Sequence, residues 1–309
     1  MIRCSFISSV VAGWFLMGFV ASLGAEESRA LRVLFVGNSH TWIDRGYDVP
    51  RTVAALVNAN PARRRIETAM VPVRQTLQLH WESGAVQKRL KSERWDYVVI
   101  QGQSGEVLYD NQGMREYGKK LAEVVKAAGA KPVFYMLWER RDSPGTFEQI
   151  IQPTYTEMAR DNEGGLAPVG AAWMQSLKLQ PKLALHRPDG NHSNDTGCYL
   201  TACVFYALFT GERPQGLAGA ARLSRLPSGV SAFLEERAWE AAKGHLLEES
   251  VAQSASVPAC VTASAPAPTP AVPVAVAPAP STQSVSLPVR NNRVALRVQS
   301  TRRGMVLTR

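Results

Sequence analysis

Short apolar runs alternate with amphipathic stretches along the chain, and this alternation constrains the fold more than any other feature. Five runs have the length of buried strands: Leu31–Val36, Ile66–Val73, Tyr97–Gln101, Pro132–Leu137 and Leu166–Ala171. Helical spacing of apolar residues marks 48–60, 114–129, 147–162, 194–210 and 230–249. Strands that alternate with helices predict a parallel sheet with helices on both faces. Right-handed crossovers then favour a doubly wound, flavodoxin-like α/β fold.

A sheet of this kind also predicts where chemistry takes place, because ligands bind at the carboxyl ends of its strands. Ser39 stands at the first such position, just after the run that ends at Val36. Gly37 permits the tight turn that projects a serine hydroxyl from the sheet edge. The alternative is a serine that caps a helix, a position that serine favours.

A second segment, Asp189-Gly190-Asn191-His192, lies in a loop before the helix predicted at 194–210. An acid three residues before a histidine can turn back and accept its Nδ1–H, which leaves Nε2 free to take a proton from a serine. The alternative is an ordinary turn with a solvated aspartate and a surface histidine. Because both segments fall at the predicted functional edge, together they favour a Ser–His–Asp triad.

These two segments resemble two sequence blocks of the GDSL/SGNH hydrolases. Gly37-Asn38-Ser39-His40 is similar to the nucleophile block, and Asp189-Gly190-Asn191-His192 matches the last block, Asp-x-x-His. The resemblance covers about residues 31–215. It implies a three-layer α/β sandwich with a central parallel sheet. It also implies that Ser39 attacks an ester carbonyl, that His192 is the base and that Asp189 orients it, with no metal or organic cofactor.

The two middle blocks depart from the family pattern. The family supplies three oxyanion donors, namely the backbone N–H of the nucleophile (here Ser39), a glycine N–H and an asparagine side chain. Arg74 stands where the glycine is expected, and Gln103 aligns with the asparagine. Asn38 also replaces the usual aspartate. These departures indicate a divergent branch of the family.

Two other functions remain open on the same fold. One is a catalytically silent glycan-binding module, and the other is an acyltransferase. The expected partner in each case is a small-molecule or polysaccharide ester, or a glycan, and no nucleic acid is expected. Other polar and aromatic candidates are a structural helix histidine, His80, and residues that could either line a pocket or serve the core and the solvated loops: Trp81, Trp138, Glu139, Asp142 and His186.

Cysteine and histidine spacing predicts neither a zinc site nor a disulfide framework. Cys198 and Cys203 are five residues apart on a predicted helix, so they point in different directions.

The N-terminus has the pattern of a signal peptide over residues 1–25, with Arg3 before the apolar run Val10–Ala21 and small residues near Ala25. Cleavage predicts a periplasmic or extracellular protein, and an uncleaved segment would be a membrane anchor. Residues 26–249 are then the hydrolase-like domain. Residues 250–286, rich in Pro and Ala and without charge, read as an extended, disordered linker.

The formal net charge of +9 belongs mainly to the ends of the chain. Arg3 and six arginines of a basic tail at 287–309 account for seven of these charges, which leaves +2 for residues 26–249. The body is therefore close to neutral, and the tail is the part expected to adsorb to anionic polymers. The tail arginines are Arg290, Arg293, Arg297, Arg302, Arg303 and Arg309.

Overall fold

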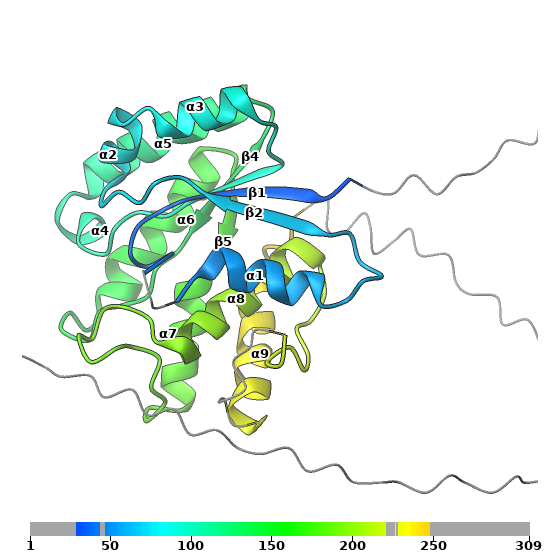
Figure 1. Cartoon of the computed structure of the whole chain (residues 1–309). Coiled ribbons are helices and arrows are strands. Elements are labelled where there is room, and N and C mark those ends of the chain that lie inside the picture. The colour runs from blue at the N-terminus through cyan, green and yellow to red at the C-terminus, as the bar shows by residue number, and fades with distance from the viewer. Residues whose placement is uncertain (1–28, 44–46, 221–225, 227, 248–309) are drawn as a thin grey trace, which may run out of the picture. The chain divides into compact units, whose positions relative to one another are not determined.

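The computed structural model describes residues 29–43, 47–220, 226 and 228–247 (Figure 1). The signal peptide, the linker and the basic tail expected from the sequence lie outside these residues. Within the part that is described, no helix combines the length and the apolar character needed to cross a bilayer.

Five strands form one all-parallel sheet in the order β2-β1-β3-β4-β5. This is the flavodoxin-like order, so the predicted α/β fold class is confirmed. Val36 pairs with Ile100 and Phe35 with Met70, which brings the carboxyl ends of three neighbouring strands to one edge. The strands are β1 (Leu31–Val36), β2 (Ile66–Met70), β3 (Tyr97–Ile100), β4 (Lys131–Tyr135) and β5 (Gly165–Ala167).

Helices cover both faces of this sheet. In Figure 1, α2, α3, α5 and α6 lie on one side, and α1, α7, α8 and α9 lie on the other. The helices are α1 (Val49–Asn58), α2 (Leu77–Glu82), α3 (Ala85–Ser92), α4 (Glu106–Tyr109), α5 (Asn111–Ala127), a π-helical turn η1 (Phe147–Ile151) that leads into α6 (Gln152–Asp161), α7 (Val169–Leu179), α8 (Asp195–Thr210) and α9 (Ser228–Ala242).

Four of the five strands end earlier than predicted: β2 at Met70, β3 at Ile100, β4 at Tyr135 and β5 at Ala167. A proline explains two of these ends. The run predicted to continue to Ala171 stops at Ala167, and α7 begins at Val169. Pro168 explains this, because it has no N–H for the ladder and its fixed φ suits a helix start. The second strand ends at Met70, although the Val71 N–H still donates to Phe35 O at 3.1 Å. Pro72 ends the pairing there for the same reason.

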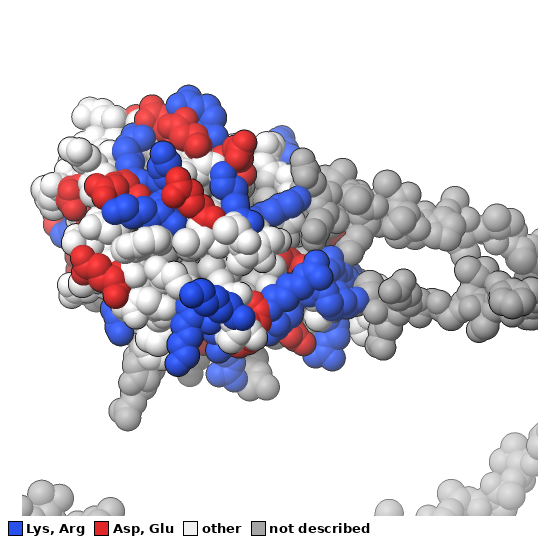
Figure 2. All heavy atoms as spheres, turned by 90° about the horizontal axis from the view of Figure 1, so that it is seen from above, with Lys and Arg blue, Asp and Glu red and all other residues white. Residues whose placement is uncertain are grey.

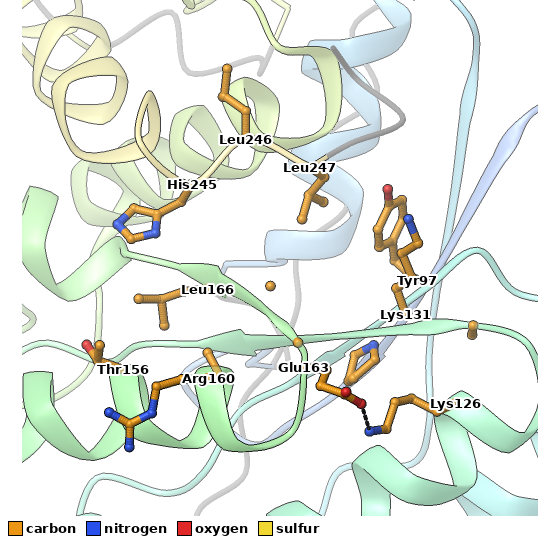
Figure 3. A pocket seen from close by; sticks show the side chains of 15 residues that line it. Tyr97, Lys126, Lys131, Thr156, Arg160, Glu163, Leu166, His245, Leu246 and Leu247 are labelled. Atoms are coloured by element: carbon orange, nitrogen blue, oxygen red, sulfur yellow. Dashed lines mark hydrogen bonds and ion pairs between the residues drawn. The ribbon is translucent and has the colours of Figure 1, made fainter. Parts of the chain in front are cut away.

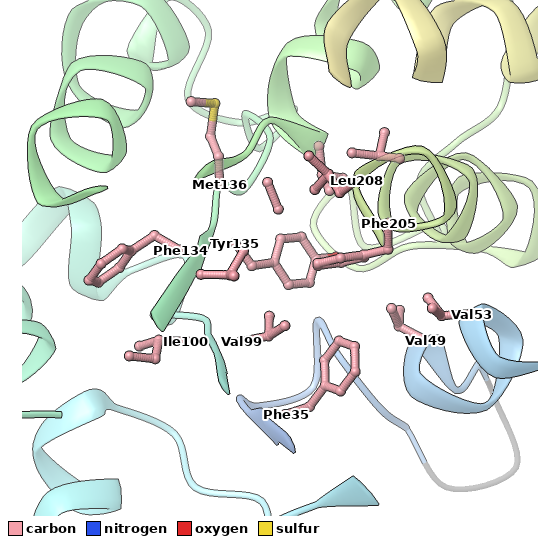
Figure 4. Packing of buried hydrophobic residues seen from close by; sticks show 14 of the residues in the cluster. Phe35, Val49, Val53, Val99, Ile100, Phe134, Tyr135, Met136, Phe205 and Leu208 are labelled. Carbon is pink, nitrogen blue, oxygen red and sulfur yellow. The ribbon is translucent and has the colours of Figure 1, made fainter. Parts of the chain in front are cut away.

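The core between the sheet and α8 is aromatic (Figure 4). Phe205 of α8 packs edge-on against Phe35 and Tyr135, with ring centroids 5.5 and 5.2 Å apart. Phe134, next to Tyr135 on β4, points to the opposite face, as the alternation of a strand requires. Both faces of the sheet are therefore packed.

Helix α8 is the most deeply buried helix of the described chain, with every residue from Gly197 to Phe209 buried. A helix that is apolar all round needs neighbours on every side, and α8 contacts α1, α7, α9 and β5. Cys198 and Cys203 are both free and buried within it. The Asn194 side chain caps the helix by accepting from the Gly197 N–H at 3.0 Å, so the loop before α8 is joined to a rigid element.

Charged side chains of both signs cover the surface. Basic and acidic residues lie among one another over much of the face in Figure 2, in line with the small net charge of the body. Arg115 with Glu157 and Arg32 with Glu93 are examples of such pairs, with N–O distances of 2.7 and 2.6 Å.

Candidate active site

Ser39 lies in a tight turn that follows β1. The Asn38 carbonyl accepts from the N–H groups of Thr41 at 2.9 Å and Trp42 at 3.1 Å. Gly37 is needed here for space, because a Cβ would collide with Thr41 Oγ1 and with the Gln101 side chain. The next helix starts only at Val49, so Ser39 caps no helix and its hydroxyl is available for other partners.

The three residues predicted as a triad form a line of contacts in which His192 lies within hydrogen-bond distance of both Ser39 and Asp189. Ser39 Oγ is 2.8 Å from His192 Nε2, and His192 Nδ1 is 2.8 Å from Asp189 Oδ2. Asp189 Oδ1 accepts from the backbone N–H groups of Asn191 and His192, each at 2.9 Å. Gly190 has φ +68°, a left-handed conformation that glycine adopts without strain and that closes this loop.

These contacts keep Asp189 ionised. Partial desolvation raises its pKa. The hydrogen bonds from the Asn191 N–H and from the ring and backbone of His192 outweigh this effect, so the pKa falls below its ordinary value, to about 2. The aspartate therefore carries its negative charge next to Nδ1 at any physiological pH. That charge fixes the Nδ1–H tautomer and directs the Nε2 lone pair at the Ser39 hydroxyl.

Two buried side chains hold the nucleophile turn. Gln101 Oε1 accepts from the Asn38 N–H at 3.2 Å and from Thr41 Oγ1 at 2.8 Å, while its amide nitrogen donates to Gly102 O. His80 of α2, predicted as a structural helix histidine, donates from Nε2 to Gly37 O at 3.0 Å. Burial lowers the pKa of His80 to about 4, so this ring is neutral.

The predicted oxyanion donors occupy different environments. In the described chain the Ser39 N–H has no acceptor. Gln103 Oε1 accepts from the N–H groups of Gly105 at 2.8 Å and Glu106 at 2.9 Å, so only its amide nitrogen remains to donate elsewhere. Arg74 is exposed, with its guanidinium on Val73 O at 3.0 Å.

The loop around Arg74 contacts the nucleophile turn through its backbone. Asn38 Nδ2 donates to Gln75 O at 3.2 Å. The loop that carries Arg74 is therefore tied to the residue next to Ser39. The three proposed oxyanion donors follow β1, β2 and β3 at one sheet edge.

Several candidates from the sequence belong to the core. Trp138 stacks on Trp173 with centroids 3.9 Å apart, and His186 is buried with Nε2 on Glu139 O at 3.1 Å. Trp81 is partly buried against the core. Asp142, by contrast, is outside the core: it is exposed and pairs with Arg140.

The side chain of Glu139 accepts from the Phe147 N–H at 3.0 Å, a contact that fixes the start of η1. The aromatic side chain that is exposed near Ser39 is instead Trp42, at 36%.

Three residues whose contacts the sequence did not predict also meet at this site: His40, Asn191 and Trp138. His40 stacks on His192 with centroids 4.9 Å apart, and its Nε2 lies 3.2 Å from the Asn191 side chain. Trp138 Nε1 donates to Asn191 O at 2.9 Å. The sequence does show a histidine next to Ser39. Its contact with Asn191 could not be predicted from it, because the two residues are 151 positions apart.

Two hollows lie outside the triad. One, of about 500 Å³, is at the amino ends of β3, β4 and β5, where Tyr97, Lys131 and Gly165 line it (Figure 3). This is the sheet edge opposite to Ser39. The other is a groove of about 700 Å³ between α1 and β2, with Trp42 and Val73 among its lining residues. Among the described residues, no cluster of three or more His, Cys, Asp or Glu side chains could hold a metal ion.

Comparison with known proteins places the fold. No protein-family model and no curated protein matches the chain. Its structural neighbours are SGNH hydrolases, GDSL-like lipases and acetylxylan esterases. A DUF4886 family protein from Bacteroides uniformis is 17% identical over 72% of this chain and 96% of its own, with a TM-score of 0.50. This match shows the shared fold.

Two further neighbours have lower structural similarity to this chain. A candidate SGNH hydrolase from Slackia heliotrinireducens is 26% identical over 58% of this chain and 98% of its own, with a TM-score of 0.46. Axe2, an acetylxylan esterase from Geobacillus stearothermophilus, is 17% identical over 57% of this chain and 93% of its own, also at 0.46.

Proposed function

We propose that this protein is an exported serine hydrolase that cleaves carboxylic esters through Ser39, His192 and Asp189. One observation carries the proposal. An unbroken line of two 2.8 Å contacts runs from the Ser39 hydroxyl through both ring nitrogens of His192 to Asp189. It lies after β1 and before α8, where the fold predicts that ligands bind.

In the proposed reaction, Ser39 Oγ attacks the ester carbonyl while His192 Nε2 takes the hydroxyl proton. Asp189 stays ionised and stabilises the imidazolium that forms. The protonated ring then gives its proton to the departing alcohol, which leaves an acyl group on Ser39. Water, deprotonated by the same ring, attacks the acyl-enzyme and releases the acid.

Negative charge develops on the carbonyl oxygen during both steps, so donors must face it. We assign this role to the Ser39 N–H, the Gln103 amide nitrogen and the backbone N–H at Arg74. The Gln103 amide suits the role because two backbone N–H groups hold its oxygen, which fixes the orientation of the NH₂ group. Preorganised donors of this kind contribute more than mobile ones.

We further propose an acetylated polysaccharide or a similar cell-surface ester as substrate. The support is Trp42, which is exposed and lines the groove between α1 and β2. Its backbone N–H donates to Asn38 O at 3.1 Å, next to Ser39. Aromatic faces of this kind suit the apolar faces of sugar rings. Export would place the enzyme where such esters occur.

A fluorophosphonate probe tests the proposal on the mature protein, residues 26–309. Labelling should be stoichiometric, and mass spectrometry should locate the adduct on Ser39. Hydrolysis of a simple aryl ester should accompany it and be lost in Ser39→Ala. Absence of both labelling and hydrolysis in the folded wild type would overturn the proposal and leave the silent glycan-binding module in its place.

A further inference from the structure

A line of polar contacts joins the two catalytic segments independently of the triad. Asn38 Oδ1 accepts from the backbone N–H of His40 at 3.0 Å and lies 3.2 Å from Nδ1 of the His40 ring. The other ring nitrogen, Nε2, lies 3.2 Å from Asn191 Oδ1. His40 thus spans from the residue before the nucleophile to the residue before His192.

Hydrogen-bond counting determines how this line is arranged. Asn38 Nδ2 donates to Gln75 O at 3.2 Å, so both ends of the Asn38 amide are fixed and Oδ1 can only accept. Nδ1 of His40 must then carry the ring proton. In a neutral ring Nε2 is an acceptor, and so is Asn191 Oδ1, which faces it in the structure. The assignment therefore requires the Asn191 amide to be turned by 180°, so that its NH₂ group donates to Nε2.

The ring is neutral because it is buried. The His40 side chain is only 2% exposed. Desolvation, together with the nearby His192, lowers the pKa of His40 to about 3. A neutral ring is what the site requires, because His192 must itself become positive during the reaction, with its ring centroid 4.9 Å from that of His40.

Packing makes this arrangement rigid. The His40 and His192 rings are stacked with an interplanar angle of 28°, and the Trp138 ring is tilted against His40 with centroids 5.4 Å apart. Trp138 itself stacks on Trp173 and donates from Nε1 to Asn191 O at 2.9 Å. Both the side chain and the carbonyl of Asn191 are therefore held from the core.

We propose that His40 is a positioning residue, which fixes the ring plane of His192 by stacking and fixes the catalytic loop through its hydrogen bond to Asn191. This role rests on the proposed hydrolase function. It predicts that loss of the His40–Asn191 contact impairs the chemical step while substrate binding persists. A displacement of about 1 Å at reacting groups is enough to cost on the order of 100-fold in rate.

A double-mutant cycle tests this role. His40→Phe keeps a flat ring for stacking but removes both nitrogens, and Asn191→Ala removes the amide while keeping the backbone contacts of the loop. Each change should lower kcat by about 10- to 100-fold with KM within about twofold. The double mutant should be no worse than the poorer single mutant, because both changes break the same contact.

Asn162→Ala is the matched control. Asn162 is buried, and its side chain donates to Met158 O at 2.7 Å at the end of α6, away from the catalytic edge. This control should reduce the unfolding temperature and leave kcat within about twofold. A general loss of stability would therefore not reproduce the kinetic effect.

The outcomes separate the two proposals. Suppose first that the wild type hydrolyses esters and is labelled at Ser39, so that the hydrolase function stands. The positioning role is then wrong if kcat is unchanged in either single mutant, or if the two losses in kcat multiply in the double mutant. If His40→Phe does not fold, kcat and the fluorophosphonate labelling rate of Asn191→Ala decide, since both must fall by about tenfold. If wild type is inert and unlabelled, the hydrolase function fails, and the positioning role fails with it.

Discussion

Acidification from pH 7 to pH 5 should destabilise this protein through two buried histidines. His40 and His80 are 2% and 1% exposed, and burial lowers their pKa values from 6.5 to about 3 and about 4. Between pH 6.5 and these values the unfolded chain binds a proton at each ring and the folded protein does not. Stability is therefore complete above about pH 6.5 and falls as the pH falls.

The magnitude follows from the size of this interval. One pH unit within it corresponds to about 1.4 kcal/mol for each ring, and pH 5 lies about 1.5 units below the ordinary value. Each histidine should therefore remove about 2 kcal/mol from the free energy of unfolding between pH 7 and pH 5, and the two together about 4 kcal/mol. The pKa of His186 is also lowered by burial, so its contribution has the same sign.

Urea unfolding of the mature protein at the two pH values measures this loss. His80→Gln keeps a donor for Gly37 O and cannot titrate, so its loss should be smaller than that of wild type by about 2 kcal/mol. Leu79→Gln, an exposed position on the same helix, is the control and should keep the full loss. An undiminished pH dependence in a folded His80→Gln protein would refute the argument, since His80 would then be protonated in the native state.

Three further predictions concern turnover. Ser39→Ala and His192→Ala should each lower ester hydrolysis by on the order of 10³-fold or more, with the double mutant hardly worse; a folded Ser39→Ala protein with wild-type activity contradicts the triad. Gln103→Ala and Gln103→Glu should both lower kcat by about 10- to 10³-fold at similar KM. Gln103→Glu keeps an oxygen for the two backbone donors, so normal kcat in that variant alone would assign Gln103 a structural role. Deletion of residues 250–309 should leave turnover of a small soluble ester within about twofold. It should weaken adsorption to anionic polymers, measured in a binding assay at low salt. Loss of turnover would instead show that these residues are part of the domain.

The sequence predicted those parts of the fold that depend on local pattern. The cores of the five strands lie where the sequence predicted them. The clearest case is β3, which is an unbroken apolar run because it is buried on both faces. The strand ends and α7 were predicted wrongly around Pro168. The short helix α4 was not predicted, because tertiary contacts such as the Leu77 N–H on Glu106 Oε1, at 3.0 Å, hold it in place.

The same distinction applies to the site. Asp189 and His192 could be paired from the sequence because they are three residues apart in one loop. The support from His80 and Asn191 could not be predicted, since their contacts with the nucleophile turn span 43 and 151 residues. Side-chain partners at such separations depend on the packing of the whole sheet. The roles assigned to these residues in catalysis remain predictions.

The histidine at residue 40 restricts which side chain can stand at position 38. A carboxylate at position 38 would lie about as close to His40 Nδ1 as the Asn38 oxygen does now, at 3.2 Å, and would favour a protonated ring. That charge would stack on His192, which must accept a proton for the serine to attack. An uncharged amide at position 38 still accepts the two N–H groups of His40 and leaves its ring neutral. The uncharged side chain of Asn38 therefore allows a neutral His40 to stack on His192, the proposed general base.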